Sequence, residues 1–130
     1  MHASANHHPG RPWLSLLVNL CLAASAFAQG TPEQGFRLMS AQASGNCLAC
    51  HSVPGMNGSN SSFGPSLQKV AQRYSSSELR QWVTDARQIK PDTLMPPLGT
   101  TVGTLRPIRA QAILSPEDIG HIVAALETLK

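Results

Sequence analysis

Apolar residues recur at helical spacing near the end of the chain. They form one stripe along a helix with about 3.6 residues per turn. The members of this stripe are Ile119, Ile122, Val123, Leu126 and Leu129. Ser115 precedes the stripe as an N-cap, and Pro116 takes the first helical position. Glu117 and Asp118 suit the positive end of the helix dipole. The pattern predicts a final amphipathic helix that begins at Pro116.

A second helical stripe lies in the middle of the chain. Its apolar members stand at i, i+3, i+4 and i+7, and they are Leu79, Trp82, Val83 and Ala86. Ser76 or Ser77 precedes them in a position to cap the helix. A shorter helix is expected within residues 65–74. It would carry Leu67, Val70 and Ala71.

The segment near residue 31 has the features of a helix start. Thr31 is placed as the N-cap, Pro32 at the first helical position, and Gln34 to close a capping box. The helix is expected to run to about Ala43. The residues expected to face the core are Phe36 and either Met39 or Ser40.

Two long segments lack a helical pattern. Residues 53–64 are rich in Gly, Asn and Ser, which predicts a mobile surface loop without regular structure. Residues 90–114 contain Pro91, Pro96 and Pro97, which forbid a continuous helix, so irregular wrapping is expected. No alternation of period two persists anywhere, and the predicted fold class is all-α with long loops. A flat cofactor would give the second loop a surface on which to pack.

The N-terminal segment has the features of a secretory signal peptide. Arg11 and the amino terminus are positive, residues 13–24 are largely apolar, and an A-x-A cleavage site ends at Ala28. The apolar stretch is too short for a typical membrane span, so we expect cleavage and no membrane anchor. The prediction divides the chain into a signal peptide, residues 1–28, and one domain, residues 29–130.

The most specific chemical motif in the chain is CxxCH at residues 47–51. Thiols at the spacing of Cys47 and Cys50 can add to two vinyl groups of one haem, and the adjacent His51 reaches the iron from the same side. The motif predicts one covalently bound c-type haem. Export suits this chemistry, since bacteria attach such haems outside the cytoplasm, and the expected location is the periplasm.

Two cysteines at this spacing also occur in redox sites, in one half of a zinc site, and by chance. A thioredoxin-like CxxC stands at a strand-to-helix turn, and zinc needs two further Cys or His ligands close by. The remaining Cys and His residues are Cys21, expected to leave with the signal peptide, three histidines near the amino terminus, and His121. His121 falls on the face of the final helix opposite Ile119, so we expect it in solvent rather than on the iron.

A methionine sulfur usually supplies the second axial bond in haems that transfer electrons at high potential. Met39 is expected in the core of the first helix, and Met56 lies too close to the attachment site to cross the haem easily. Met95 lies in a loop stiffened by prolines, which can hold a thioether at a low ordering cost. We predict that Met95 binds the iron opposite His51. The alternatives are a methionine that only covers the haem edge, and an open or water-bound iron.

Charge and composition limit the range of partners. The formal net charge is only +3, and Arg11 of the signal peptide supplies one of these charges. A field this weak argues against nucleic acid or an anionic membrane as the partner. Aromatic residues make up only 5% of the chain, so a buried porphyrin would supply apolar bulk that the domain otherwise lacks.

The order of these features resembles the class I cytochromes c. These have a helix, CxxCH, a Gly-Pro pair after a loop, a Met-Pro loop and a closing amphipathic helix. The resemblance covers essentially all of residues 29–130, and it implies that the first and last helices cross beside the haem. In that family the proline carbonyl of the Gly-Pro pair accepts the other ring N–H of the haem histidine, a role that would fall to Pro65. Ala125 departs from the pattern, since many such proteins have an aromatic residue there, and this puts the helix-crossing contact in question.

Five segments carry a narrower resemblance to the SoxX family, the small monohaem subunits of the SoxXA cytochromes of bacterial sulfur oxidation. They are residues 45–51, 64–67, 79–85, 91–97 and 126–130, and P-x-T-x-M-P and L-x-x-W-V-x-D are the most specific motifs. The resemblance implies a heterodimer with a SoxA-type cytochrome, which couples thiosulfate to a carrier-protein cysteine (L-cysteine S-thiosulfotransferase). The catalytic centre would lie on SoxA. This chain would pass the electrons to a small cytochrome or another acceptor.

Two other functions are also compatible with the sequence. One is a free-standing, diffusible monohaem carrier for another respiratory chain. The second is a haem-based sensor or peroxidase-like enzyme, which needs an open iron position and a polar distal group. The sequence offers no distal His or Arg pairing that supports the sensor or the peroxidase.

Overall fold

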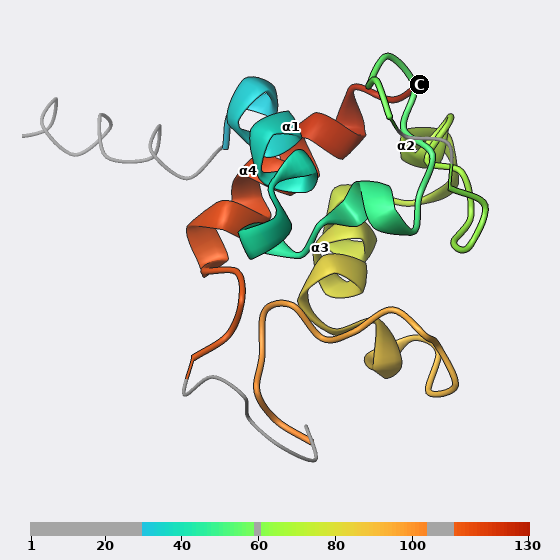
Figure 1. Ribbon diagram of the computed structural model, residues 1–130. Helices are drawn as coiled ribbons and strands as arrows, with labels where there is room; N and C mark the ends of the chain where they lie inside the picture. The colour runs from blue at the N-terminus through green and yellow to red at the C-terminus, as the bar shows by residue number, and fades with distance from the viewer. Residues whose placement is uncertain (1–29, 59–60, 104–110) are drawn as a thin grey trace, which may run out of the picture.

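The computed structural model describes residues 30–58, 61–103 and 111–130, which fold into a helical domain (Figure 1). Its α-helices are α1 (Pro32–Ser40), α2 (Val70–Arg73), α3 (Ser76–Asp85) and α4 (Pro116–Glu127). Short 3-10 turns are η1 (Gln42–Ser44), η2 (Cys47–Ala49) and η3 (Ala86–Gln88). These ranges contain no strand, so the predicted all-α class with long loops is confirmed. The predicted signal peptide lies outside the described residues. Within the described part, no helix has the length and apolar character to cross a bilayer.

Helices α1 and α4 cross at close range and form the most extensive helix contact of the fold (Figure 1). A Cβ on Gly35 of α1 would overlap the carbonyl oxygen of His121 and lie 2.7 Å from the Cβ of Ala125. Ala125 of α4 is fully buried. The crossing therefore forms without an aromatic residue, because two small residues let the helix backbones approach each other.

The start of α1 is held by His121 rather than by its own side chains. Thr31 stands at the N-cap as predicted, but its side chain makes no capping hydrogen bond, and the capping box expected with Gln34 does not form. The Thr31 backbone N–H instead donates to Nδ1 of His121 at 2.8 Å. The His121 side chain is only 19% exposed. The expectation of a solvated His121 is wrong, because the start of α1 covers this part of α4.

Helix α1 ends at Ser40, before the predicted end near Ala43. The Ser40 hydroxyl donates to the carbonyl oxygen of Arg37 at 2.9 Å, and Ala41 takes an extended conformation. A hydroxyl that bonds to a carbonyl one turn back competes with the hydrogen bonds of the helix itself. Met39 is buried and Ser40 is exposed, so Met39 is the residue that faces the core.

Helix α3 is capped by Ser75 and not, as predicted, by Ser76 or Ser77. Ser75 Oγ accepts from the Glu78 N–H at 3.4 Å, and the Glu78 carboxylate accepts from the Ser75 N–H at 2.7 Å. Ser75 alone of the three serines stands three residues before a glutamate, so reciprocal bonding selects it. The predicted apolar stripe is confirmed. Leu79, Val83 and Ala86 are buried and Trp82 is half-buried.

Helix α4 agrees with its sequence prediction. Ser115 Oγ accepts from the Asp118 N–H at 3.1 Å, and the Asp118 carboxylate accepts from the Ser115 N–H at 2.9 Å. Every residue of the predicted stripe is buried. The stripe joins a core whose other members include Met39, Val70, Leu79, Val83, Leu98 and Leu114.

Helix α2 covers only Val70–Arg73 of the helix expected within residues 65–74. Lys69, just before it, has a left-handed backbone with φ of +56°, which interrupts any helix there. The preceding carbonyls also have other partners. Pro65 O faces a ring nitrogen of His51 at 2.7 Å, and Arg73 bonds to the carbonyl oxygens of Ser66 and Gln68. These bonds would be lost if residues 65–69 were helical.

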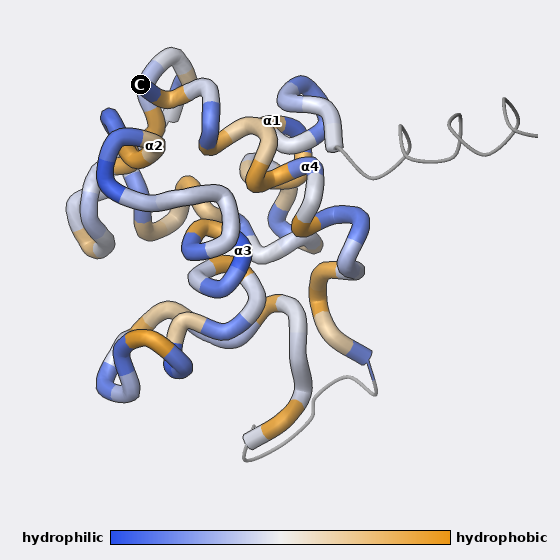
Figure 2. The backbone as a smooth tube through the Cα atoms, turned by 180° about the vertical axis from the view of Figure 1, so that it is seen from behind, coloured by the Kyte–Doolittle hydropathy of each residue, from blue (hydrophilic) through white to orange (hydrophobic). Residues whose placement is uncertain are grey.

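The two predicted loops lack helix and strand wherever they are described. The loop between η3 and α4 contains hydrophobic as well as polar positions (Figure 2). Of these, Leu98 is 3% exposed, and its side chain lies 3.1 Å from where a Cβ would stand on Gly45. The Leu98 carbonyl accepts from the Leu114 N–H at 2.9 Å. Leu98 thus anchors this loop beside the CxxCH segment.

Candidate functional site

The chain turns sharply just before the CxxCH motif. Gly45 and Asn46 have positive φ values of +104° and +46°, and glycine and asparagine are the residue types that tolerate this region best. The chain then forms η2, and the His51 N–H donates to the Cys47 carbonyl at 2.9 Å. Cys47 and Cys50 form no disulfide, and they border one hollow together with His51. The turn therefore places the three motif residues around a single space.

Burial gives Cys47 an unusual environment for a thiol. It raises the pKa of the Cys47 thiol to about 11. The unattached thiol is therefore neutral near pH 7, which makes it a weak nucleophile. A thioether carries no charge, so the same apolar surroundings impose no such cost on it. The environment of Cys47 suits a thioether better than a redox-active thiolate.

Pro65 and Gly64 orient the His51 ring. Nδ1 of His51 lies 2.7 Å from the carbonyl oxygen of Pro65. Because a carbonyl only accepts, Nδ1 carries the ring proton and Nε2 keeps its lone pair for a metal. A Cβ on Gly64 would lie 2.8 Å from Cε1 and 2.9 Å from Nδ1 of the ring. Glycine at this position lets the chain pass close enough for Pro65 to reach the ring.

Two adjoining hollows of about 360 and 470 Å³ open beside the motif. The residues that border both are Cys47, His51, Pro65, Thr93, Met95 and Leu98. Apolar side chains from all four α-helices line the larger hollow, among them Met39, Val70, Leu79 and Ile122. A concave site with apolar walls and a few polar groups is typical of a cofactor pocket.

Of the methionines at residues 39, 56 and 95, Met95 alone borders both hollows. It is half-buried, and its N–H donates to Thr93 Oγ1 at 3.2 Å. Met39 is 1% exposed, lies in the core and borders only the larger hollow, and Met56 borders neither. His121 also borders neither hollow.

The side chains around this space fit a haem. An imidazole and a thioether are the axial pair of many electron-transfer haems, and the two thiols stand next to the imidazole. Residues 30–58, 61–103 and 111–130 contain no group of three or more His, Cys, Asp or Glu side chains that could hold a metal ion. These residues therefore do not provide the four ligands of a structural zinc site. The strand-to-helix turn of a thioredoxin-like site is likewise missing from these ranges.

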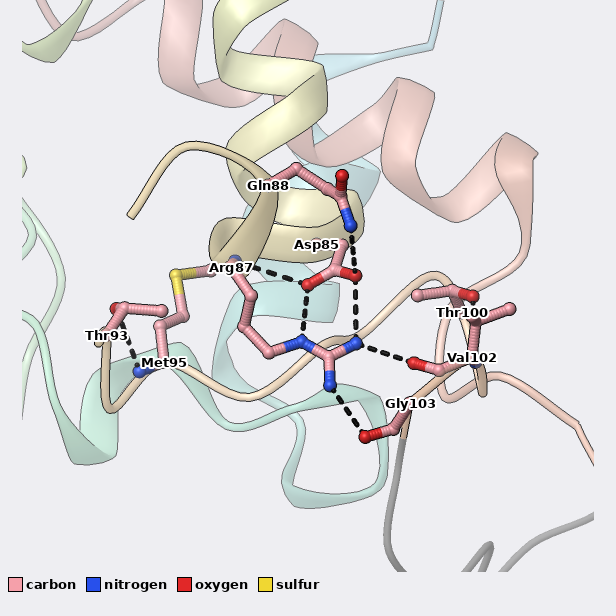
Figure 3. A network of polar contacts seen from close by, with 8 residues as sticks. All are labelled: Asp85, Arg87, Gln88, Thr93, Met95, Thr100, Val102 and Gly103. Carbon is pink, nitrogen blue, oxygen red and sulfur yellow. Dashed lines mark hydrogen bonds and ion pairs between the residues drawn. The ribbon is translucent and has the colours of Figure 1, made fainter. Parts of the chain in front are cut away.

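Three residues shape the site in ways that the sequence did not reveal. Gly64 was visible in the Gly-Pro pair, but its contact with the His51 ring was not. Arg73 borders the larger hollow and donates to the carbonyl oxygens of Gln68 at 2.7 Å and Ser66 at 2.9 Å. Arg87 donates in the same way to the carbonyl oxygens of Gly103 and Val102, close to the loop that carries Met95 (Figure 3). Such bonds to backbone carbonyls leave no pattern in a sequence.

Comparison with known protein families identifies the class of this protein. Residues 32–130 match the family model described as cytochrome c. The match covers most of the chain, so the chain belongs to the cytochrome c family. A covalently bound haem c follows, and Cys47, Cys50 and His51 fit the family's CxxCH motif.

A solved structure narrows the similarity further. The chain is similar to a chain in the crystal structure of SoxXA from P. pantotrophus, with 31% sequence identity and a TM-score of 0.75. The similarity covers 80% of this chain and 85% of that chain. The predicted class I fold is confirmed, and the chain is a SoxX-like electron-transfer cytochrome. No curated protein matches the sequence at a significant level.

Proposed function

We propose that this chain is the electron-carrying subunit of a two-subunit cytochrome of thiosulfate oxidation. The observation that carries the proposal is the similarity to a chain of SoxXA, which extends over 80% of this chain and 85% of that one. A SoxA-type partner couples thiosulfate to a carrier-protein cysteine and holds the catalytic centre. This chain receives the released electrons and passes them to a small cytochrome or another acceptor.

Within this proposal, Cys47 and Cys50 hold the haem through thioether bonds, and His51 and Met95 bind its iron. The bound haem supplies a centre that accepts and releases one electron at a time. Pro65 keeps the proton on Nδ1 of His51, which leaves Nε2 for the iron. The buried side chains of the larger hollow exclude water from the ligands. Support comes from the position of His51 and Met95, which border the same two hollows.

The axial assignment has a spectroscopic test. Oxidised holoprotein should show the near-infrared charge-transfer band of a sulfur–iron bond. Met95→Ala should abolish this band. Met39→Leu and Met56→Leu are matched controls and should keep it. A band that survives Met95→Ala would overturn the assignment of the sixth ligand.

The proposed location is the periplasm, after removal of residues 1–28. Protein recovered from the periplasmic fraction of a host that attaches c-type haems should begin at Gln29, which mass spectrometry of the intact chain can measure. Haem-loaded protein that keeps its first 28 residues would contradict this part of the proposal.

The pairing with SoxA is tested by purification. The full chain and a tagged SoxA-type subunit are produced together, and the complex is passed through size-exclusion chromatography. We expect the two haem proteins to elute together in equal amounts. A stable monomer with no affinity for the partner would contradict the pairing and favour the free-standing carrier.

A further inference from the structure

One charged side chain is buried in the described part of the chain, and it lies at the end of α3. Asp85 is 5% exposed. Its carboxylate accepts from two guanidinium nitrogens of Arg87, with Nε to Oδ1 at 2.8 Å and Nη2 to Oδ2 at 2.9 Å, and from the Arg87 backbone N–H at 3.2 Å (Figure 3). Gln88 adds a longer bond of 3.5 Å to Oδ2. The two-point pairing fixes the plane of the guanidinium, since both partners are planar.

The remaining donors of Arg87 reach a distant part of the chain. Nη2 donates to the carbonyl oxygen of Val102 at 2.7 Å, and Nη1 donates to the carbonyl oxygen of Gly103 at 3.1 Å. Figure 3 shows the guanidinium between the Asp85 carboxylate and these two carbonyls. Arg87 therefore connects the end of α3 to residues that follow it by 15 and 16 positions.

The segment enclosed by these bonds is the loop that carries Met95. The loop leaves η3 near Ile89 and returns past Gly99, whose N–H donates to the Thr84 carbonyl at 2.9 Å. A Cβ on Gly99 would lie 2.6 Å from Ile119 Cδ1, so the returning part of the loop is packed tightly against the helices. Just beyond this contact, the bonds from Arg87 to Val102 and Gly103 hold the two ends of the loop together, and we call this place the neck of the loop. A loop closed at its neck has fewer conformations to lose when a side chain within it binds a ligand.

We propose that Arg87, held in place by Asp85, is a positioning residue that keeps Met95 on the haem iron. This inference rests on the proposed ligation by Met95. A thioether is a weak ligand, so its occupancy depends on how far the loop can move away from the iron. By tying both ends of the loop together, Arg87 disfavours the open form that an external ligand needs in order to replace Met95.

The affinity of the oxidised holoprotein for added imidazole measures this opening. Arg87→Ala should raise the affinity about tenfold, which corresponds to about 1.4 kcal/mol. Because this variant removes the charged partner of a buried carboxylate, Arg87→Lys is made as well. It keeps a positive charge beside Asp85 but cannot make the forked contacts, so a smaller increase is expected. Arg80→Ala is the matched control, since Arg80, on the preceding helix α3, also donates to a backbone carbonyl, that of Pro116 at 3.4 Å. It should leave imidazole affinity unchanged.

The outcomes separate this inference from the ligand assignment. If the wild-type protein lacks the sulfur–iron band, or if Met95→Ala keeps it, both the ligation and the positioning role are wrong. If Met95→Ala abolishes the band but the folded Arg87 variants bind imidazole as the wild type does, the positioning role alone is wrong. An equal increase in Arg80→Ala would also overturn it, because the effect would then be a general loss of stability. Raised affinity in both Arg87 variants, with Arg80→Ala unchanged, supports the proposal.

Discussion

Gly35 and Ala125 meet where the first and last helices cross, and there is no room for a further carbon atom between them. A Cβ on Gly35 would lie 2.7 Å from the Cβ of Ala125 and would also overlap the His121 carbonyl oxygen. Both contacts involve atoms that cannot rotate away, a backbone oxygen and a Cβ. The crossing of α1 and α4 therefore depends on the absence of a side chain at position 35.

Gly35→Ala should lower the free energy of unfolding by about 3 kcal/mol, since the helices must separate to admit the methyl group. Gly120→Ala on α4 is the matched control. Among the described residues, the nearest neighbour of its Cβ would be the Arg80 side chain at 3.6 Å, and the better helix propensity of alanine should stabilise the protein by up to about 1 kcal/mol. Urea unfolding of the two holoproteins measures both values. Equal stability of the two variants would show that the crossing is not tightly packed.

Gly64→Ala should disturb the haem histidine. The added methyl would lie within 3.0 Å of two His51 ring atoms, so either the ring or the Pro65 carbonyl must move. Weakening the Nδ1 hydrogen bond makes the imidazole a poorer electron donor, which favours reduced iron. The reduction potential should therefore rise. For this one-electron couple, a tenfold fall in the affinity of the imidazole for oxidised iron relative to reduced iron corresponds to about 59 mV.

Gly58→Ala is the control for this measurement. Gly58 belongs to the same loop and has φ of +80°, but a Cβ there would meet no atom of the described residues within 4 Å. It should leave the potential unchanged. An unchanged potential in Gly64→Ala as well would mean that the Pro65 contact does not tune the iron.

Asp85 should contribute stability that is lost in acid. The hydrogen bonds from Arg87 lower the pKa of this carboxyl below its ordinary value of 3.8. The folded protein then binds fewer protons than the unfolded chain, so the pair stabilises the fold above about pH 4 and loses this effect as the pH falls through the lowered pKa. Asp85→Asn should therefore destabilise more at pH 7 than at pH 2. Urea midpoints at both pH values measure the difference.

Asp92→Asn serves as the comparison, because Asp92 is exposed and surface substitutions cost little. If the cost of Asp85→Asn is the same at pH 7 and pH 2, the ionised pair does not contribute to stability.

An apolar rim, Phe63 and Leu94, stands at the edge of the smaller hollow. Phe63 is 70% exposed and Leu94 is 79% exposed, and both border that hollow. Exposed apolar side chains beside a functional site mark surfaces that bind other proteins. Leu94→Asp should weaken binding to the SoxA-type partner about tenfold, measured by calorimetry.

Ile113→Asp provides the control, because Ile113 is also partly exposed but borders neither hollow. The sulfur–iron band should persist in both variants, which separates loss of docking from loss of the haem site. Equal weakening by the two substitutions would place the partner elsewhere.

Local patterns in the sequence predicted much of this fold. The cap and the stripe of α4 depend on residues only three or four positions apart, so Ser115 and Ile119 were assigned correctly. The helix expected from residue 65 was shortened by Lys69 and by the bond between Pro65 and His51. That bond joins loop residues that are distant in sequence, and helix propensity contains no information about it.

The part of the site that could be predicted consists of residues in recognisable sequence motifs. The CxxCH motif identified Cys47 and His51, because haem attachment imposes a fixed spacing. The Met-Pro loop led to Met95 as the proposed second ligand, and Met95 borders the same two hollows as His51. The pairing of Asp85 with Arg87 could not be foreseen, since residues two positions apart do not face each other in a helix. They meet only because α3 ends at Asp85 and η3 begins. His121 was misplaced for a similar reason, since periodicity identifies the opposite face of a helix but not what covers it.

In the proposed function, electrons from thiosulfate reach a haem whose iron is bound by Met95. This claim is tested most directly by following the near-infrared sulfur–iron band of this chain while thiosulfate is added to the oxidised complex with a SoxA-type partner and its carrier protein. Reduction of the iron removes the band, so we expect it to fade as thiosulfate is consumed and to stay constant when the partner is left out. A band that stays constant while the complete mixture consumes thiosulfate would contradict the proposed function.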